Sequence, residues 1–339
     1  MAVGLKDVAA KAGVSVKTVS NVINSYPFVK PETRERVQQA VAELGYRPNL
    51  SARRLRTGRS ELIALSLPEI AMPYFAEMAS LIVDAAEQLG WTVLIDRTSG
   101  ERSHEQRTTA GIRADLIDGS IVSPLSMTPS DIAALRPDHP VVLLGERLAR
   151  AGADHIAVDN VAAAREATAH LIGLGRVRIA AIGAQPQHSG TSALRLEGYR
   201  VALADAGLDA SADLVAQGNN FHREDGYTAM QRLLAAERPP DAVFCFNDLL
   251  ALGCIRAIVE AGLRVPEDVA VVGFDDIEDC RFVTPTLTTV APDKEFIAVT
   301  AVDLLSRRVR GDRSTPPQDV VAQHRLVVRE STVGRTTTG

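Results

Sequence analysis

The sequence predicts an N-terminal all-α helix-turn-helix head, followed by an α/β body of two doubly wound parallel-sheet subdomains. Three observations lead to this fold class. Residues 5–24 contain two short helical patterns joined by a glycine-containing turn. From Glu61 onwards, short apolar runs alternate with helical segments, which is the pattern of parallel strands connected by right-handed crossovers. The chain has 339 residues, which is too long for one small domain.

The first two predicted helices form a helix-turn-helix. Apolar and small residues recur at helical spacing over residues 5–12, and Gly13 supplies a turn in which a positive φ is allowed. Ser15 is a natural N-cap for the second helix. The inner side of that helix is predicted to carry Val16, Val19, Val22 and Ile23. Such a pair can place its second helix in a DNA major groove, although the pattern also fits an ordinary helical hairpin.

A third helix and a basic segment follow. The helix is predicted to begin at Pro31, which suits a first helical position, and to stop at Gly45, so the head is assigned to residues 1–45. Residues 46–60, YRPNLSARRLRTGRS, have two interpretations. They form either a disordered linker or a hinge helix that orders against DNA and a dimer mate. In the second case Leu55 would be an apolar wedge in the minor groove.

The charge of the chain is distributed unevenly. The formal net charge is −5, but residues 1–60 carry 11 Lys and Arg against 4 Asp and Glu. The head and basic segment therefore have a net charge of +7 and the remainder −12. This asymmetry favours a polyanion as partner of the head alone. The absence of a run of about 20 apolar residues and of a signal peptide predicts a cytoplasmic protein without membrane contact.

Motifs of catalysis and metal binding are not evident in the sequence. The chain lacks G-x-G-x-x-G at the first strand-helix turn, G-x-x-x-x-G-K-[ST], G-x-S-x-G and any His/Cys metal cluster. His104 and His222 have no evident acidic or nucleophilic partner. Cys245, Cys254 and Cys280 lack metal-ligand spacing and are expected to be buried, inert thiols. We therefore predict a protein that is not an enzyme and needs no cofactor.

The body is assigned to residues 61–331 and divides near Asp159. The stretch TPTLTTVAP (residues 284–292) is interpreted as a crossover back to the first subdomain. The predicted boundaries are about 61–159 and 292–320 for the first subdomain, and about 160–291 and 321–331 for the second. A strand is predicted near residues 324–331, and residues 332–339 are expected to be a disordered tail.

Polar residues follow several predicted strands of the body. They are Glu146 and Arg147, Asn247 and Asp248, and Asp275 and Asp276, while Arg195 opens a helix. Ligands of open α/β sheets bind beyond the carboxyl ends of the strands, which face one cleft in a body of two subdomains. These side chains suit a neutral, hydroxyl-rich ligand because carboxylates and amides can bind pairs of hydroxyl groups. Each one taken alone fits a loop cap or a surface ion pair equally well.

Four motifs, in this order, resemble those of the lactose-repressor/galactose-repressor (LacI/GalR) family of bacterial transcription regulators. They are LKDVAAKAGVSVKTVSNVIN, TRERVQQAVAELGYRPN, FNDLLALGCIRAIVEAGLRVPEDVAVVGFDD and TPTLTTV. The resemblance covers residues 4–331. It implies a homodimer that binds a near-palindromic DNA operator through two heads, with hinge helices in the central minor groove. It also implies a periplasmic-binding-protein-like body that binds a small-molecule effector and forms the dimer.

This resemblance also assigns residues. Base-reading positions match Val16, Lys17 and Asn21. Positions that contact the DNA backbone match Ser15, Thr18, Ser20, Asn24, Thr33, Tyr46 and Asn49. The hinge helix matches Ala52, Arg53 and Leu55. Effector-binding positions match Tyr74, Arg147, Thr191, Arg195, Phe221, Asn247 and Asp275, with Phe221 as an aromatic platform for a ring.

The sequence departs from the family pattern at two positions and at its C-terminus. Lys30 stands where the family often has a helix-capping serine, and Met72 stands where many members have an asparagine. The C-terminus lacks leucine heptads, so a dimer is expected. We expect a repressor released from its operator by a small carbohydrate. The alternatives are a same-family regulator activated by a purine, sugar-phosphate or protein corepressor, and a sugar-binding protein without DNA function.

Overall fold

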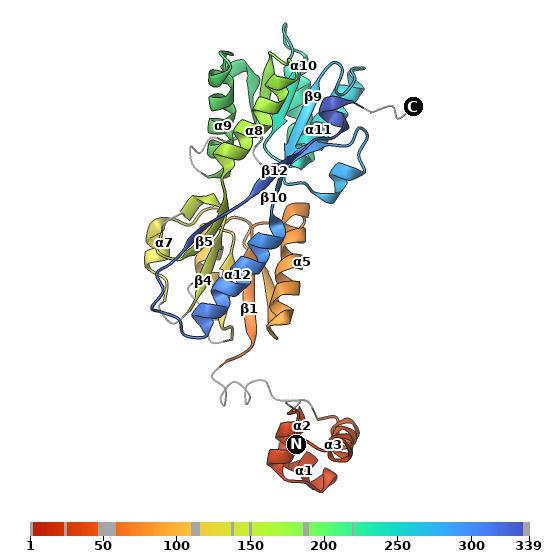
Figure 1. The fold of residues 1–339 in the computed structure, drawn as a ribbon, viewed down its shortest axis with the longest axis vertical. Helices are drawn as coiled ribbons and strands as arrows, with labels where there is room; N and C mark the ends of the chain where they lie inside the picture. Colours follow the sequence, from red (N-terminus) through yellow and green to blue (C-terminus); the bar gives the residue numbers. More distant parts are fainter. Residues whose placement is uncertain are drawn as a thin grey trace. The chain divides into compact units, whose positions relative to one another are not determined.

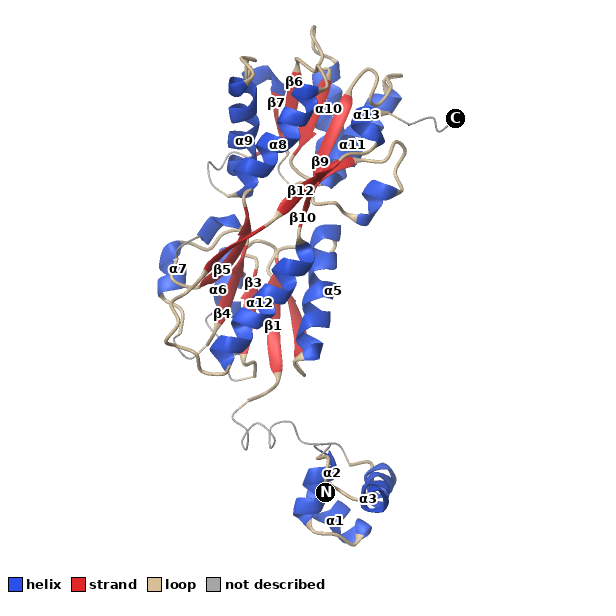
Figure 2. Ribbon diagram, viewed as in Figure 1, coloured by secondary structure: helices blue, strands red, loops and turns tan. Residues whose placement is uncertain are grey.

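The computed structural model describes residues 3–23, 26–46, 59–109, 116–136, 139–148, 151–185, 190–218 and 220–334. The chain divides into two compact units, residues 1–60 and residues 61–339. Several predicted DNA-binding positions lie outside the described residues, namely Asn24, Asn49, Ala52, Arg53 and Leu55. The observed helices and sheets confirm the predicted fold class (Figures 1 and 2).

The head contains three helices, α1 (Leu5–Ala12), α2 (Val16–Ile23) and α3 (Pro31–Leu44). Gly13 has φ 64° and Gly45 has φ 60°, so both helix ends use the left-handed conformation that glycine adopts without strain. The N-cap of α2 is formed by Ser15, whose Oγ accepts a hydrogen bond from the Thr18 amide at 3.1 Å. The core of the head is a small apolar cluster that includes Val8, Ala9, Ala12, Val19, Val22, Val37 and Ala40.

Two details of the head differ from the sequence analysis. Val16 was expected on the inner side of α2 but is 41% exposed. It is the first residue of the helix, and Val14 of the preceding turn packs against the apolar cluster instead. Tyr46, assigned to the basic segment, also packs against this cluster. Lys30 precedes α3 without a side-chain capping bond, and the helix begins on Pro31.

The first subdomain of the body is built on a six-stranded sheet in the order β11-β5-β4-β3-β1-β2, in which all pairs are parallel. Its strands are β1 (Leu62–Leu67), β2 (Thr92–Arg97), β3 (Gly119–Val122), β4 (Val141–Leu144), β5 (Asp154–Val158) and β11 (Asp319–Ala322). Its helices are α5 (Pro73–Gln88), α6 (Arg102–Thr109), α7 (Pro129–Ala133) and α12 (Lys294–Val309). The short 3₁₀ helix η1 (Glu146–Leu148) follows β4.

The second subdomain has a mixed six-stranded sheet in the order β12-β10-β9-β8-β6-β7. Its strands are β6 (Ile179–Ala184), β7 (Val215–Gln217), β8 (Ala242–Cys245), β9 (Ala270–Phe274), β10 (Thr288–Pro292) and β12 (His324–Val327). Only the β10–β12 pair is antiparallel among these described strands. Its α-helices are α8 (Asn160–Gly173), α9 (Thr191–Asp205), α10 (Arg223–Leu234), α11 (Asp248–Glu260) and α13 (Glu330–Val333), and its 3₁₀ helices are η2 (Ala212–Leu214) and η3 (Glu278–Arg281).

The chain passes between the two sheets three times, after β5, after β10 and between β11 and β12 (Figure 1). Asp159 and Asp293 stand at the first two passages and each caps the following helix, accepting from the amides of Ala162 and Phe296. The amide of Asp293 donates to the carbonyl of Gln323 at 2.9 Å, which joins the second passage to the third. These connections hold the carboxyl ends of the two sheets opposite each other.

The C-terminal part of the body required corrections. The sequence pattern does not predict β11, and the strand predicted near residues 324–331 ends at Val327 and is followed by α13. The disordered tail predicted for residues 332–339 begins too early. Thr332 is buried in α13, and its hydroxyl forms hydrogen bonds with the side chains of His170 and Thr288. These residues are short and polar, so their burial leaves no apolar pattern in the sequence. Among the helices of the described ranges, none combines the length and apolar content needed to span a bilayer.

Candidate functional site

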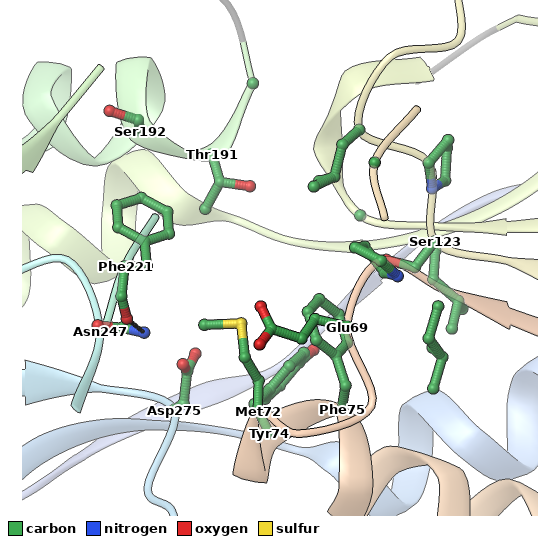
Figure 3. A pocket seen from close by; sticks show the side chains of 18 of the residues that line it. Glu69, Met72, Tyr74, Phe75, Ser123, Thr191, Ser192, Phe221, Asn247 and Asp275 are labelled. Atoms are coloured by element: carbon green, nitrogen blue, oxygen red, sulfur yellow. Dashed lines mark hydrogen bonds between the residues drawn. The ribbon is translucent and has the colours of Figure 1, made fainter. Parts of the chain in front are cut away.

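A cavity of about 720 Å³ lies between the two subdomains of the body, at the carboxyl ends of both sheets (Figure 3). Its first wall comes from the segments after β1, β2, β3 and β4, and its second wall from those after β6, β7, β8 and β9 and from the start of α9. Six of the predicted effector-binding residues line it, namely Tyr74, Thr191, Arg195, Phe221, Asn247 and Asp275. The seventh, Arg147, lies in η1, and its side chain is outside the described part of the structure.

Arg195 is the most heavily engaged of these side chains. It is only 7% exposed, its Nε donates to Asn160 Oδ1 at 2.7 Å, and one terminal nitrogen donates to the carbonyl of Phe246. Its guanidinium carbon lies 3.4 Å from the ring centre of Phe274. Burial lowers the pKa of Arg195, and the nearby carboxylate of Asp275 opposes this shift. The remaining terminal nitrogen, Nη2, lies 3.8 Å from Asp275 Oδ1.

Asp275 follows β9 with φ 113° and is 8% exposed. Its amide donates to the carbonyl of Val290 at 2.8 Å, which fixes the residue at the end of the sheet. Among the described residues, the only polar contact recorded for its carboxylate is the 3.8 Å approach to Arg195, which is too long for a hydrogen bond. Burial raises the pKa of Asp275 to about 7, against the lowering effect of Arg195 and Lys294. The carboxylate therefore has free acceptor capacity toward the cavity.

Asn247 has a supporting role in this arrangement. Its Oδ1 caps α11 by accepting from the Leu250 amide at 2.9 Å, and its Nδ2 donates to the carbonyl of Phe221 at 3.0 Å. Phe221 has φ 59°, a conformation that costs energy for a residue with a large side chain. The amide of Asn247 thus holds the aromatic ring of Phe221 at the cavity, as Figure 3 shows.

Tyr74 and Phe75 supply the aromatic part of the first wall. They begin α5 and pack edge to face, with ring centres 5.4 Å apart. Burial, together with the charges of Asp275 and Glu146, raises the pKa of Tyr74, so its phenol stays protonated and can donate a hydrogen bond. Tyr74 and Phe75 both line the cavity, and Tyr74 is close enough to Asp275 for the charge of that carboxylate to act on its phenol. The cavity therefore combines aromatic faces with convergent polar groups.

Direct contacts connect the two walls. Thr191 Oγ1 donates to Glu146 Oε2 at 2.6 Å, and His222 Nε2 lies 3.3 Å from Glu69 Oε2. The second contact corrects the expectation that His222 has no acidic partner. His104 also has one, because its Nε2 lies 3.5 Å from Oε2 of Glu101, the residue just before α6.

Two other predicted candidates are structural. Asp248 is fully buried, and its carboxylate accepts from Thr289 Oγ1 at 2.6 Å and from the Ile277 amide at 3.0 Å. Burial, and then the charge of Asp275, raises the pKa of Asp248 to about 8. Asp276 accepts from Arg329 at 2.6 Å. Neither carboxylate lines the cavity.

Several cavity residues were missed by the sequence analysis or left out of its predicted site. They include Glu69, Phe75, Arg97, Ser123, Gln185 and His222. Glu69, Arg97 and Ser123 stand at or just after the ends of the first three strands, so the strand-end rule could have found them. His222 could not be found this way, because its place depends on the fold of the α10 segment. The three cysteines are free and buried, and no group of three His, Cys, Asp or Glu in the described ranges is arranged to hold a metal.

In the head, the predicted base-reading residues all lie on α2, with Val16 and Lys17 at its start and Asn21 in its second half. Lys17 is exposed like Val16, whereas Asn21 is half-buried. Ser15 is exposed, and its Oγ both caps the helix and lies 2.9 Å from Thr18 Oγ1. The remaining described positions, Ser20, Thr33 and Tyr46, are half-buried.

Comparisons with known proteins cover both units. The model of bacterial regulatory proteins of the lacI family matches residues 4–49, and the periplasmic binding protein-like domain matches residues 168–332. The HTH-type transcriptional repressor PurR of Erwinia tasmaniensis is 35% identical over 331 residues, covering 96% of each chain. A transcriptional regulator CelR–cellobiose complex is 34% identical, with a TM-score of 0.71 and coverage of 97% and 99%. The lac repressor dimer bound to operator and the anti-inducer ONPF is 31% identical, with a TM-score of 0.83 and coverage of 98% and 99%.

Proposed function

Because the chain belongs to the LacI family of bacterial regulatory proteins, we propose that a carbohydrate bound in the cleft controls its binding to a DNA operator. The chain is a DNA-binding transcriptional repressor and not an enzyme. The family membership predicted from the four motifs is thereby confirmed. The carbohydrate, the homodimer and the roles of single residues are parts of the proposal.

The operator half of the proposal assigns recognition to α2. Lys17 would bond guanine O6 or N7, Asn21 would reach an adenine or a phosphate, and Val16 would contact an apolar base edge. The exposure of Val16 and Lys17 at the start of α2 supports this assignment, because a recognition helix contacts bases with its N-terminal residues. Two heads in a homodimer would read two half-sites of a near-palindrome.

The effector half rests on one observation, the free acceptor capacity of Asp275 beside the Nη2 of Arg195. A sugar hydroxyl donates to one group and accepts from the next, so it satisfies a carboxylate and a guanidinium together. Phe221, Tyr74 and Phe75 supply aromatic faces for the apolar side of a sugar ring. A cavity of about 720 Å³ has room for a disaccharide. The similar protein CelR is known in complex with cellobiose.

A purine corepressor is the second candidate, because the relatives named PurR match the chain over nearly its whole length. Phe221 could stack on a base, and Asp275 could accept from a ring N–H group. The two candidates differ in sign, since a carbohydrate inducer weakens operator binding and a corepressor strengthens it.

The experiment first selects an operator from a random duplex library with the full-length protein. Thermal shift is then measured with cellobiose, glucose, glucose 6-phosphate and hypoxanthine. A ligand at about 100 times its Kd stabilises the native state by about 2.7 kcal/mol, which raises the melting temperature by several degrees. A sugar that stabilises the protein and releases the operator supports the proposal. Stabilisation by hypoxanthine with tighter operator binding overturns the carbohydrate assignment in favour of the second candidate.

A further inference from the structure

Glu105 on α6 is a buried carboxylate outside the set of cavity-lining residues. Its exposed fraction is 0%, and it accepts three consecutive main-chain hydrogen bonds. The donors are the amides of Leu125 at 2.7 Å, Ser126 at 2.9 Å and Met127 at 2.8 Å. Within the described ranges, these three main-chain amides are the hydrogen-bond partners of the Glu105 carboxylate. No Lys, Arg or His side chain there forms an ion pair with it.

The segment held by Glu105 is a wall of the cavity. Residues 123–126 follow β3 and line the cavity, together with Ser99 and Gly100 after β2. The two loops are tied to each other because Ser126 Oγ donates to the carbonyl of Gly100 at 2.6 Å. One carboxylate and one hydroxyl therefore fix the two loops that follow β2 and β3, the strands on either side of β1.

An apolar residue would fill the position of Glu105 without the desolvation cost of a buried charge. It would leave three main-chain amides unpaired, that of Met127 buried and those of Leu125 and Ser126 part-buried, and the loop would have to find another conformation to satisfy them. Three hydrogen bonds to one ionised acceptor are strong and strictly directional. They fix the backbone of residues 125–127, shortly after Ser123, which lines the cavity and is labelled in Figure 3.

We propose that Glu105 is a positioning residue for effector recognition, which holds residues 123–127 in the conformation that the effector binds. It acts through the loop and does not touch the effector. The inference rests on the proposed function, because it takes this cavity as the effector site. A site supported by such buried hydrogen bonds is preformed, so its loss weakens binding even where the fold survives.

The test compares full-length wild-type protein with Glu105→Gln, which keeps the shape but loses the charge and one acceptor oxygen. Glu101→Gln is the matched control, because Glu101 lies just before α6 with its side chain 61% exposed. Cellobiose, glucose 6-phosphate and hypoxanthine are the probes, and the one that stabilises the wild type is titrated by calorimetry. Hydrogen exchange of peptides covering residues 123–128 is measured in parallel.

We expect Glu105→Gln to weaken binding of the probe by about 10- to 100-fold, with operator affinity within about twofold of wild type. Hydrogen exchange should accelerate in residues 123–128, and Glu101→Gln should behave as the wild type. Ser126→Ala is the second variant, for use where Glu105→Gln does not fold. It removes the bond to the Gly100 carbonyl and one hydroxyl of the cavity wall, and it should cause a several-fold loss of probe affinity with faster hydrogen exchange in residues 123–128.

Unchanged probe affinity in Glu105→Gln overturns the inference while leaving the proposed function in place. Equal losses of probe and operator binding also overturn it, because they indicate a general structural role. If no probe stabilises the wild type, the proposed function fails first and the inference fails with it.

Discussion

We predict that the carboxylate of Asp275 makes effector binding in the cavity dependent on pH. Its pKa is raised to about 7, principally by burial, so its ionisation changes within the range in which the protein can be studied. Arg195 and Lys294 favour the ionised form, whereas the charges of Glu146 and Glu77 oppose it. Hydroxyl groups of a neutral sugar donate more strongly to the ionised carboxylate than to the protonated acid.

The magnitude follows from the titration. At pH 6 about a tenth of the molecules carry an ionised Asp275, and at pH 8 about nine-tenths do. If only the ionised form accepts from the sugar, the Kd at pH 6 is about tenfold higher than at pH 8, or about 1.4 kcal/mol. Binding at pH 6 then releases close to one proton, because the ligand selects the ionised form.

Calorimetry in two buffers with different heats of ionisation measures both the Kd and the released proton. Asp275→Asn should bind more weakly and show no pH dependence in this range. His222→Gln is the control for the other titratable pair at the cavity, Glu69 and His222, and should keep the tenfold change. A wild-type affinity that is constant, or that falls as pH rises, would refute the requirement for an ionised Asp275.

Three further predictions concern stability and operator binding. Gly253→Ala should destabilise the body by about 3 kcal/mol in urea unfolding, because an added Cβ would lie 1.9 Å from the carbonyl of Arg223, whereas Gly173→Ala, with nothing within 4 Å, should be neutral or stabilising. Arg195→Lys should lower the free energy of unfolding by about 1–3 kcal/mol, because an ammonium group cannot reproduce the planar fork that serves Asn160 and Phe246; an unchanged urea midpoint would contradict this. Lys17→Ala should weaken operator binding by about 1–3 kcal/mol and relax selection at one base pair in a repeated library selection, whereas Lys11→Ala, whose ammonium lies 2.8 Å from Glu43, should leave the selected sequence unchanged.

The parts of the fold that sequence predicted correctly depend on local chemistry. Gly13 and Gly45 end helices because their backbone needs a positive φ, and Pro31 begins one because its missing amide is not needed there. Local pattern alone was insufficient at Val16 and in β11. Val16 has the right spacing for the inner side of α2 but stands at the helix end, and β11 is a short, half-exposed edge strand.

The candidate site divides in the same way. Residues that directly follow strands, such as Asn247 and Asp275, could be placed at a cleft from sequence, because parallel strands end at a common edge. The separate roles of these residues could not be predicted from sequence, because they depend on which atoms come into contact in the folded protein. The side-chain amide of Asn247 bonds to α11 and to Phe221, whereas the carboxylate of Asp275 has no hydrogen-bond donor within reach among the described residues. Glu105 was beyond sequence reasoning, because its three partners lie about twenty residues away.

Contacts around Asp276 give the cleft a physical connection to both subdomains. Asp276 follows the cavity carboxylate directly, and it is held by Arg329 through its side chain and by Lys294 through its carbonyl at 3.0 Å. Lys294 begins α12 in the first subdomain and also pairs with Glu77 of α5. A ligand that prefers one arrangement of Asp275 therefore acts next to Asp276. The carbonyl of Asp276 accepts from Lys294, which lies at the passage between the two subdomains. Under the proposed function, the ligand shifts the relative position of the subdomains only by the difference in its affinity for the two arrangements. The sign of regulation would then depend on which arrangement leaves Asp275 free to accept from the ligand.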